Sequence, residues 1–186
     1  KPAENGKPAI DGALKRGVSE EVATKVWKEM ESFASYAFNK SHAAAYALLA
    51  YHTAWLKAHY PHEFYAASMC FDMHQSEKLA IFVDDARRAG IELYAPDINM
   101  SEAEFTVEET RDSHAVRYAL AGIRNVGEKA MDAIVAEREA NGRFVSLDDV
   151  FRRAPAGSMN RRQLESLTAA GAFDGLEPNR AKVLAN

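Results

Sequence analysis

The sequence lacks the features that would define a membrane, secreted or zinc-binding protein. Its 186 residues include a single cysteine, Cys70, so no internal disulfide can form and no cysteines have the spacing of a zinc site. It contains no apolar run of about 18 residues, and no signal-peptide core follows residues 1–7. We therefore expect a cytoplasmic protein in which Cys70 is a small packed apolar side chain.

The sequence also lacks an excess of positive charge. Its net charge of -4 argues, by composition alone, against binding to nucleic acid phosphates. The charges are unevenly distributed, however, because residues 101–109 are acidic. Basic residues gather in the last third at Lys129, Arg138, Arg143, Arg152, Arg153, Arg161 and Arg162. A DNA-binding face and a solvated surface of mixed charge both fit this distribution.

With 47% hydrophobic and 27% charged residues, the chain has the composition of a globular protein, and its first half predicts four helices. Ser19 has the side chain of a helix N-cap, and apolar residues recur at helical spacing from there to Phe33. Residues 41–60 contain no glycine or proline and predict a long helix. Pro61 is placed to open a further helix to about Met73. Residues 76–90 predict the fourth helix, which ends at a glycine.

Beyond that helix the pattern changes to short strands and then returns to helices. Residues 105–107 and 116–120 alternate like the strands of a small antiparallel element. Further helices are expected at residues 128–141, 146–153, 160–170 and 178–184. The polar stretch 99–104 predicts a domain boundary near Asn99. The expected fold is mainly α with a small antiparallel β element, divided into residues 1–98 and 99–186.

Residues 122–127, Gly-Ile-Arg-Asn-Val-Gly, have the form of the turn in a helix-hairpin-helix motif. Such a turn directs the free amides at the start of its second helix toward a phosphate oxygen. The contact does not depend on base sequence. Asn125 stands where this turn usually has a glycine, and asparagine tolerates positive φ less well. An ordinary strand, turn and helix would explain the same residues.

Residues 160–173 suggest a second hairpin unit. Arg161 and Arg162 stand at the start of a helix that ends at Gly171. The alternative is a surface helix capped by Asn160. Leu164, Leu167 and Phe173 are expected to be core residues in either case, which leaves the two arginines as the functional candidates.

Residues 36–46 form a polar cluster at the start of an apolar helix. If Ser41 is the N-cap, then Lys40, Ser41 and the first amides of the helix form an anion site suited to a triphosphate. His42 and Tyr46 are four residues apart, so they share a face on which they would bracket a phosphate and a base. A capped helix with one buried histidine would explain the same residues.

Residues 38–67 read FNKSHAAAYALLAYHTAWLKAHYPHEFYAA, and this string closely resembles the fingers of the C-family bacterial DNA polymerases, the alpha subunits of DNA polymerase III. The resemblance continues through YAPDIN at residues 94–99, the hairpin at 122–127, and NRRQLESLTAAGAFDGL at 160–176. Several motifs in one order, over nearly the whole chain, are far more specific than any single motif.

The resemblance implies an internal fragment, with the end of the fingers in residues 1–98 and a tandem helix-hairpin-helix region in 99–186. In that family the fingers close over the incoming deoxynucleotide, and the hairpins grip the duplex behind the active site. The implied nucleotide-binding residues are Asn39, Lys40, Ser41, His42 and Tyr46. The implied DNA-binding residues are Arg124, Asn125, Val126, Gly127, Lys129, Arg161 and Arg162.

The same resemblance implies that the metal-binding aspartates lie upstream of this sequence. No catalytic or metal site is therefore expected here; Mg²⁺ would serve the complete polymerase, and the isolated chain would be inactive. Asp84-Asp85 and Asp148-Asp149 are interpreted as capping or surface carboxylates. The implied partners are primer-template DNA and deoxynucleoside triphosphates, with other replicase subunits and the sliding clamp bound through absent parts, and no membrane.

Two other functions would account for parts of the sequence. A non-catalytic DNA-binding or protein-docking module would need only the two hairpin segments, with the cluster around Lys40 serving as packing. A small nucleotide-binding enzyme would use Lys40 and His42, but the sequence lacks a glycine-rich phosphate loop.

Overall fold

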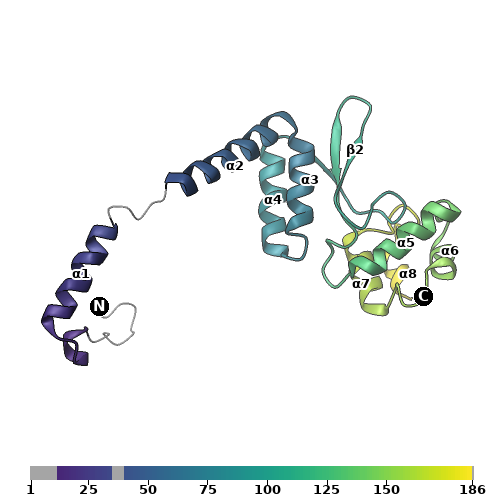
Figure 1. Cartoon of the computed structure of the whole chain (residues 1–186). Helices are drawn as coiled ribbons and strands as arrows, with labels where there is room; N and C mark the ends of the chain where they lie inside the picture. Colours follow the sequence, from purple (N-terminus) through teal and green to yellow (C-terminus); the bar gives the residue numbers. More distant parts are fainter. Residues whose placement is uncertain (1–11, 35–39, 186) are drawn as a thin grey trace. The chain divides into compact units, whose positions relative to one another are not determined.

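The computed structural model describes residues 12–34 and 40–185, and the chain forms two compact units, Lys1–His52 and Thr53–Asn186. The mainly helical character that the sequence predicts is confirmed (Figure 1). Among the described residues, no helix combines the length and the apolar character needed to cross a lipid bilayer.

The first unit contains a short 3-10 helix, η1 (Leu14–Arg16), helix α1 (Glu20–Ala34) and the start of helix α2 (Lys40–His59). Ser19 Oγ accepts a hydrogen bond from Val22 N at 3.4 Å, which confirms the predicted N-cap of α1. Ser41 lies in the first turn of α2, so its predicted place before that helix is wrong.

The second unit begins with the end of α2 and two further helices, α3 (Pro61–Phe71) and α4 (Ser76–Arg88). Pro61 occupies the first turn of α3, as predicted. Gly90 follows α4 with φ 76°, which confirms it as a left-handed C-terminal residue. Lys57 Nζ and Tyr65 Oη both donate to Asp85 Oδ2, at 2.6 and 2.7 Å, and so tie these three helices together.

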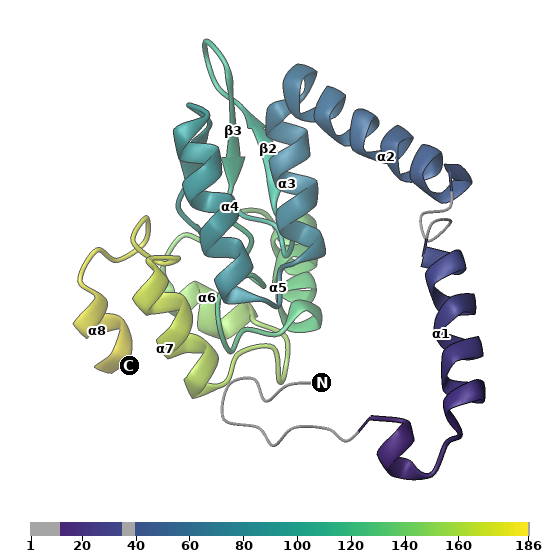
Figure 2. The same cartoon turned by 90° about the vertical axis from the view of Figure 1, so that its left-hand side faces the viewer.

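A three-stranded sheet packs beside α3, and its strands are β1 (Glu92–Tyr94), β2 (Thr106–Glu109) and β3 (His114–Arg117). Strands β2 and β3 pair antiparallel, as predicted, with Val107 opposite Val116. Strand β1 adds a parallel pairing on the other edge of β3, with Leu93 opposite Val116, so the sheet is mixed. Figure 2 shows the hairpin of β2 and β3 alongside α3.

Four helices complete the second unit: α5 (Glu128–Asn141), α6 (Leu147–Arg153), α7 (Arg161–Ala170) and α8 (Arg180–Ala185). Asn160 caps α7 in a capping box, because its side chain accepts from Gln163 N and the Gln163 side chain accepts from Asn160 N, each at 2.9 Å. Gly142 and Gly171 end α5 and α7 with φ of 82° and 88°.

A single hydrophobic core joins the parts of this unit on both sides of Asn99. Its fully buried members come from α3, the sheet, all four later helices and the loops between these elements: Tyr65, Met69, Ile98, Val116, Leu120, Met131, Ile134, Val150, Leu167, Phe173 and Val183. Asn99 itself exchanges hydrogen bonds of 2.9 and 2.8 Å with the backbone of Phe144. The polar stretch there is thus a bonded loop and not a break in packing, and a functional division at Asn99 stays a prediction.

Candidate nucleic-acid interface

The hairpin turn connects β3 to α5 and is held by its own backbone. Ile123 N donates to Leu120 O at 3.3 Å, and Val126 N donates to Ile123 O at 3.0 Å. Asn125 adopts a left-handed conformation with φ 69°, which glycine takes without strain. Val126 is among the residues predicted to bind DNA, but its side chain is buried and its amide is already bonded. Val126 therefore stabilises the turn and does not offer a group to DNA.

Helix α5 begins at this turn with an open N-terminus. Gly127 is its N-cap residue, and no side chain accepts a hydrogen bond there. Unpaired amides and the positive end of the helix dipole favour an anion at such a terminus. Lys129 is exposed one residue into the helix and adds positive charge, whereas the neighbouring Glu128 carboxylate opposes it and lies 3.8 Å from His74.

A hollow of about 610 Å³ adjoins the start of α5. The loop between α6 and α7, where Gly157 has φ 82°, forms its other wall. It is lined by Gly127, Glu128, Lys129, Ala130, Ala133, Pro155, Ala156, Gly157 and Ser158. Most of the lining residues are glycine, alanine or serine, so this side of α5 is accessible to a phosphate group beside Lys129.

Helix α7 lies against the same turn. Asn125 Nδ2 donates to Ser166 Oγ at 3.3 Å, and a methyl group at Gly127 would lie 3.7 Å from Gln163 Nε2. Arg162 stands four residues before Ser166, so it occupies the same face of α7 one turn nearer the helix start. Sequence reasoning missed Gln163 and Ser166, and the one available signal was the four-residue spacing of Ser166 from Arg162.

The two arginines at the start of α7 differ in their surroundings. Arg161 Nε donates to Glu165 Oε1 at 3.1 Å, so its charge is partly compensated within the helix. Arg162 makes no ion pair with any residue in the described part of the chain, and it is exposed. Arg162 is therefore the better placed of the two to contact a phosphate group.

Several residues of the predicted basic cluster form hydrogen bonds and ion pairs within the folded chain. Arg138 is buried and donates to Ser101 O and Glu102 Oε1, each at 2.6 Å. Arg153 donates to Asp149 Oδ2 at 3.0 Å, and its guanidinium lies over the Phe144 ring. These two arginines are not available to a ligand on the surface.

Arg152 also serves the fold, because its Nη2 donates to Asp149 Oδ1 at 2.6 Å. Together with the Val145 amide and Arg153, this contact lowers the pKa of the Asp149 carboxyl, with Arg152 as the largest cause. Across residues 99–185, the exposed cations near the hairpin turn that have no ion pair are Arg124, Lys129 and Arg162.

The second hairpin, between α7 and α8, neutralises its own charges. Arg180 donates to both carboxylate oxygens of Asp174, at 2.9 and 2.6 Å, and to Ala169 O at 2.8 Å at the end of α7. Lys182 pairs with Glu177. The Arg180 guanidinium lowers the pKa of the Asp174 carboxyl. This hairpin presents paired ions, so the first hairpin is the stronger candidate for a phosphate contact.

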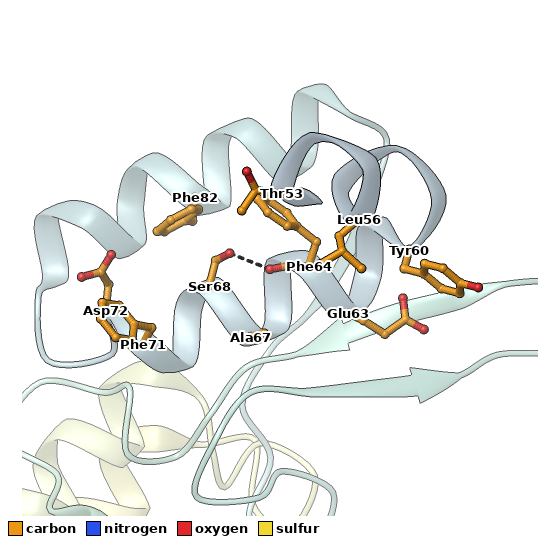
Figure 3. A pocket seen from close by; sticks show the side chains of 10 residues that line it. All are labelled: Thr53, Leu56, Tyr60, Glu63, Phe64, Ala67, Ser68, Phe71, Asp72 and Phe82. Atoms are coloured by element: carbon orange, nitrogen blue, oxygen red, sulfur yellow. Dashed lines mark hydrogen bonds between the residues drawn. The ribbon is translucent and has the colours of Figure 1, made fainter. Parts of the chain in front are cut away.

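A second hollow is an apolar groove of about 510 Å³ between the end of α2, α3 and α4 (Figure 3). Its lining residues are Thr53, Leu56, Tyr60, Glu63, Phe64, Ala67, Ser68, Phe71, Asp72 and Phe82. Ser68 Oγ donates to Phe64 O at 2.7 Å, so its hydroxyl is already bonded (Figure 3). The groove offers packing surface and no arrangement of reactive groups.

The residues predicted to bind a nucleotide lie at the start of α2, except Asn39, which lies outside the described residues. Lys40 and Ser41 stand in its first turn and are exposed. The His42 and Tyr46 rings contact each other with centroids 4.3 Å apart, so the predicted shared face is present. His42 is exposed in this chain and is not the buried histidine of the alternative reading.

The described residues provide no set of three or more His, Cys, Asp or Glu side chains arranged to hold a metal ion. The second aspartate of each pair considered from the sequence has structural partners instead. Asp85 accepts from Lys57 and Tyr65, and Asp149 accepts from two arginines. Mg²⁺ therefore does not fit these residues, and no chemical step here is assigned to it.

Cys70 is half-buried, and its thiol donates to Phe105 O at 3.4 Å. Burial raises the pKa of this thiol. Both features agree with the predicted packing role.

Comparison with known families identifies the class of this chain. The family model described as the helix-hairpin-helix motif matches residues 90–183, and the chain belongs to that family. The match spans both hairpins described above and the loop around Asn99.

Comparison with curated proteins identifies its particular relatives, each of them a DNA polymerase III subunit alpha. The relative from Neisseria meningitidis serogroup B is 49% identical over 176 residues, which is 95% of this chain and 15% of that protein. The one from Thermus aquaticus is 46% identical over 177 residues, 95% of this chain and 14% of that protein. The one from Escherichia coli K12 is 43% identical over 187 residues, 99% of this chain and 16% of that protein. The chain is thus homologous to a segment of DNA polymerase III subunit alpha, and the resemblance read from its motifs is confirmed.

Proposed function

We propose that this chain binds duplex DNA through its sugar-phosphate backbone, as one segment of a replicative DNA polymerase. The observation that carries the proposal is the turn at residues 122–127, where the open N-terminus of α5 meets the start of α7. Arg124, Lys129 and Arg162 surround it without ion pairs to other described residues. Such a surface binds phosphate and is blind to base sequence.

The binding step follows from these groups. One backbone phosphate accepts hydrogen bonds from the first amides of α5, where no side chain competes. Arg162 and Lys129 neutralise that phosphate or its neighbours and release counterions, so affinity falls as salt rises. Glu128 and the overall charge of -4 oppose binding, which makes the isolated chain a weak binder.

The experiment compares two adjacent arginines. Arg162→Ala should weaken binding to a labelled duplex and lower the slope of log K against log salt by about 0.9, the value for one phosphate contact on duplex DNA. Arg161→Ala, the matched control, should lower that slope by less, because Glu165 already compensates part of the Arg161 charge. Equal slopes for wild type and Arg162→Ala, or binding by the wild type that does not change with salt, would contradict the proposal.

Within the same proposal, Lys40, His42 and Tyr46 assist the incoming deoxynucleoside triphosphate in the complete polymerase, with Asn39 and Ser41 beside them. The support is the exposed cluster at the start of α2 and the contact between the His42 and Tyr46 rings. Mg²⁺ would supply the chemistry of nucleotidyl transfer from residues outside this chain. The isolated chain should accordingly show no primer extension.

The nucleotide role is tested in a full-length polymerase. Lys40→Ala should lower kcat/KM for nucleotide roughly tenfold to a hundredfold, as expected for loss of a charge-assisted contact of about 1.5 to 3 kcal/mol. The melting temperature should stay unchanged, because Lys40 is exposed. Unchanged efficiency would remove this segment from the nucleotide site.

A further inference from the structure

Asn125 is the only non-glycine residue with positive φ among residues 12–34 and 40–185. Left-handed backbone is costly for residues with a Cβ and free of that cost for glycine. A glycine at position 125 would therefore suit the turn itself better. The asparagine supplies something glycine cannot, which is the side-chain amide that donates to Ser166 Oγ at 3.3 Å.

This hydrogen bond joins the turn to α7 at a particular place. Ser166 stands one helical turn after Arg162 on the same face, and Gln163, the residue that follows Arg162, lies beside Gly127. Gln163 is itself fixed, because it is buried and its side chain closes the capping box with Asn160. Arg162 thus stands directly before the two points at which α7 meets the turn, one residue from the first and one helical turn from the second.

Arg162 has no carboxylate among the described residues to hold its side chain, unlike Arg161 with Glu165. Its position relative to the start of α5 is therefore set by the backbone of α7 and by the contacts that hold α7 to the turn. Charged groups on two separate helices can contact the same phosphate only if the helices keep a fixed position relative to each other.

We propose that Asn125 is a positioning residue: its link to Ser166 holds the start of α7 against the turn, so that Arg162 and the amides of α5 engage the same stretch of DNA backbone. The inference rests on the proposed DNA binding. It adds the contact that fixes the position of α7 relative to α5. Ser166 has the same role, because its hydroxyl oxygen accepts this hydrogen bond.

The test is a mutant cycle in the 186-residue chain, with a fluorescein-labelled duplex as the probe and anisotropy measured over a range of KCl. Asn125→Gly keeps the backbone conformation and removes only the amide, and Ser166→Ala removes the acceptor. Each should weaken binding about two- to fivefold and lower the salt slope by up to about 0.9, because Arg162 loses its place on the phosphate. Asn125→Gly should melt no earlier than wild type, since glycine accepts φ 69°.

Coupling between the sites decides the outcome. In the Asn125→Gly background, Arg162→Ala should weaken binding by less than about 1.5-fold further, whereas independent sites would multiply their separate effects. Arg161→Ala should have the same small effect in both backgrounds. Multiplied effects of Asn125→Gly and Arg162→Ala would overturn the positioning role while leaving the proposed DNA binding in place. A wild-type chain without salt-dependent binding would overturn both.

Discussion

Replacing Arg138 should destabilise the second unit strongly without changing how it meets DNA. Arg138 is 8% exposed, and its guanidinium donates to Ile98 O at 3.2 Å, Ser101 O at 2.6 Å and Glu102 Oε1 at 2.6 Å. In Arg138→Ala the buried carbonyl of Ser101 loses its charged donor, and a cavity replaces the side chain. Lys cannot reproduce three contacts made by one planar group.

The magnitude follows from those contacts. Leaving a buried acceptor unsatisfied costs about 1 to 3 kcal/mol, and the second carbonyl adds about 0.5 to 1.5 kcal/mol. The Glu102 carboxylate is 38% exposed, so water can replace the lost arginine. Loss of this ion pair therefore costs less than the roughly 3 to 5 kcal/mol expected when a fully buried pair is broken. We expect Arg138→Ala to lower the free energy of unfolding by about 3 kcal/mol, or the melting temperature by roughly 6 to 12 °C.

Urea unfolding followed by circular dichroism measures this change. Arg143→Ala is the matched control, because Arg143 is exposed and its side chain donates a hydrogen bond to Met100 Sδ and forms no ion pair among the described residues. It should shift the free energy by less than about 0.5 kcal/mol. A loss below about 1 kcal/mol for Arg138→Ala would refute the structural role, as would a fall in the salt slope of DNA binding in a variant that remains folded.

Two further predictions concern the fold that carries the interface. Gly122→Ala would place its methyl group 3.1 Å from Phe105 Cζ and 3.3 Å from Tyr118 Cε1, and should destabilise by about 1 to 3 kcal/mol in thermal unfolding, whereas Gly12→Ala, with no atom within 4 Å, should not. Because Arg152 and its neighbours lower the Asp149 pKa below its ordinary 3.8, the stabilisation from this carboxylate is complete above that value and disappears as pH falls through the lowered pKa. Unfolding measured from about pH 5 to 2 should therefore show a shallower acid loss for Asp149→Asn than for wild type, and parallel curves would contradict the assignment.

The helices were predictable because their signals are local. Caps such as Ser19 and Asn160, stops such as Gly90 and Gly142, and helical spacing of apolar residues set the ends of each helix regardless of its partners. The parallel strand β1 was not predicted, because three residues carry little periodicity and their pairing with β3 depends on chain more than 20 residues away.

The site was predictable in outline and not in detail. The turn at residues 122–127 and the arginines of α7 stand out in the sequence, but their charges do not reveal which carboxylates lie nearby. Arg138 and Arg153 look like DNA-binding residues until the fold shows the carbonyl and carboxylate groups that hold them. The contact between Asn125 and Ser166 joins residues 41 positions apart, which no local pattern encodes.

The shared core around Asn99 limits how the hairpin region can be separated from the helices before it. Tyr65 and Met69 of α3 are fully buried in the same cluster as Met131, Leu167 and Phe173. A chimaera of two homologous chains joined at residue 99 would take α3 from one parent and α5 and α7 from the other, although all three supply side chains to one core. A junction near residue 53 would keep these core residues within one parent, so recombination there would exchange them together.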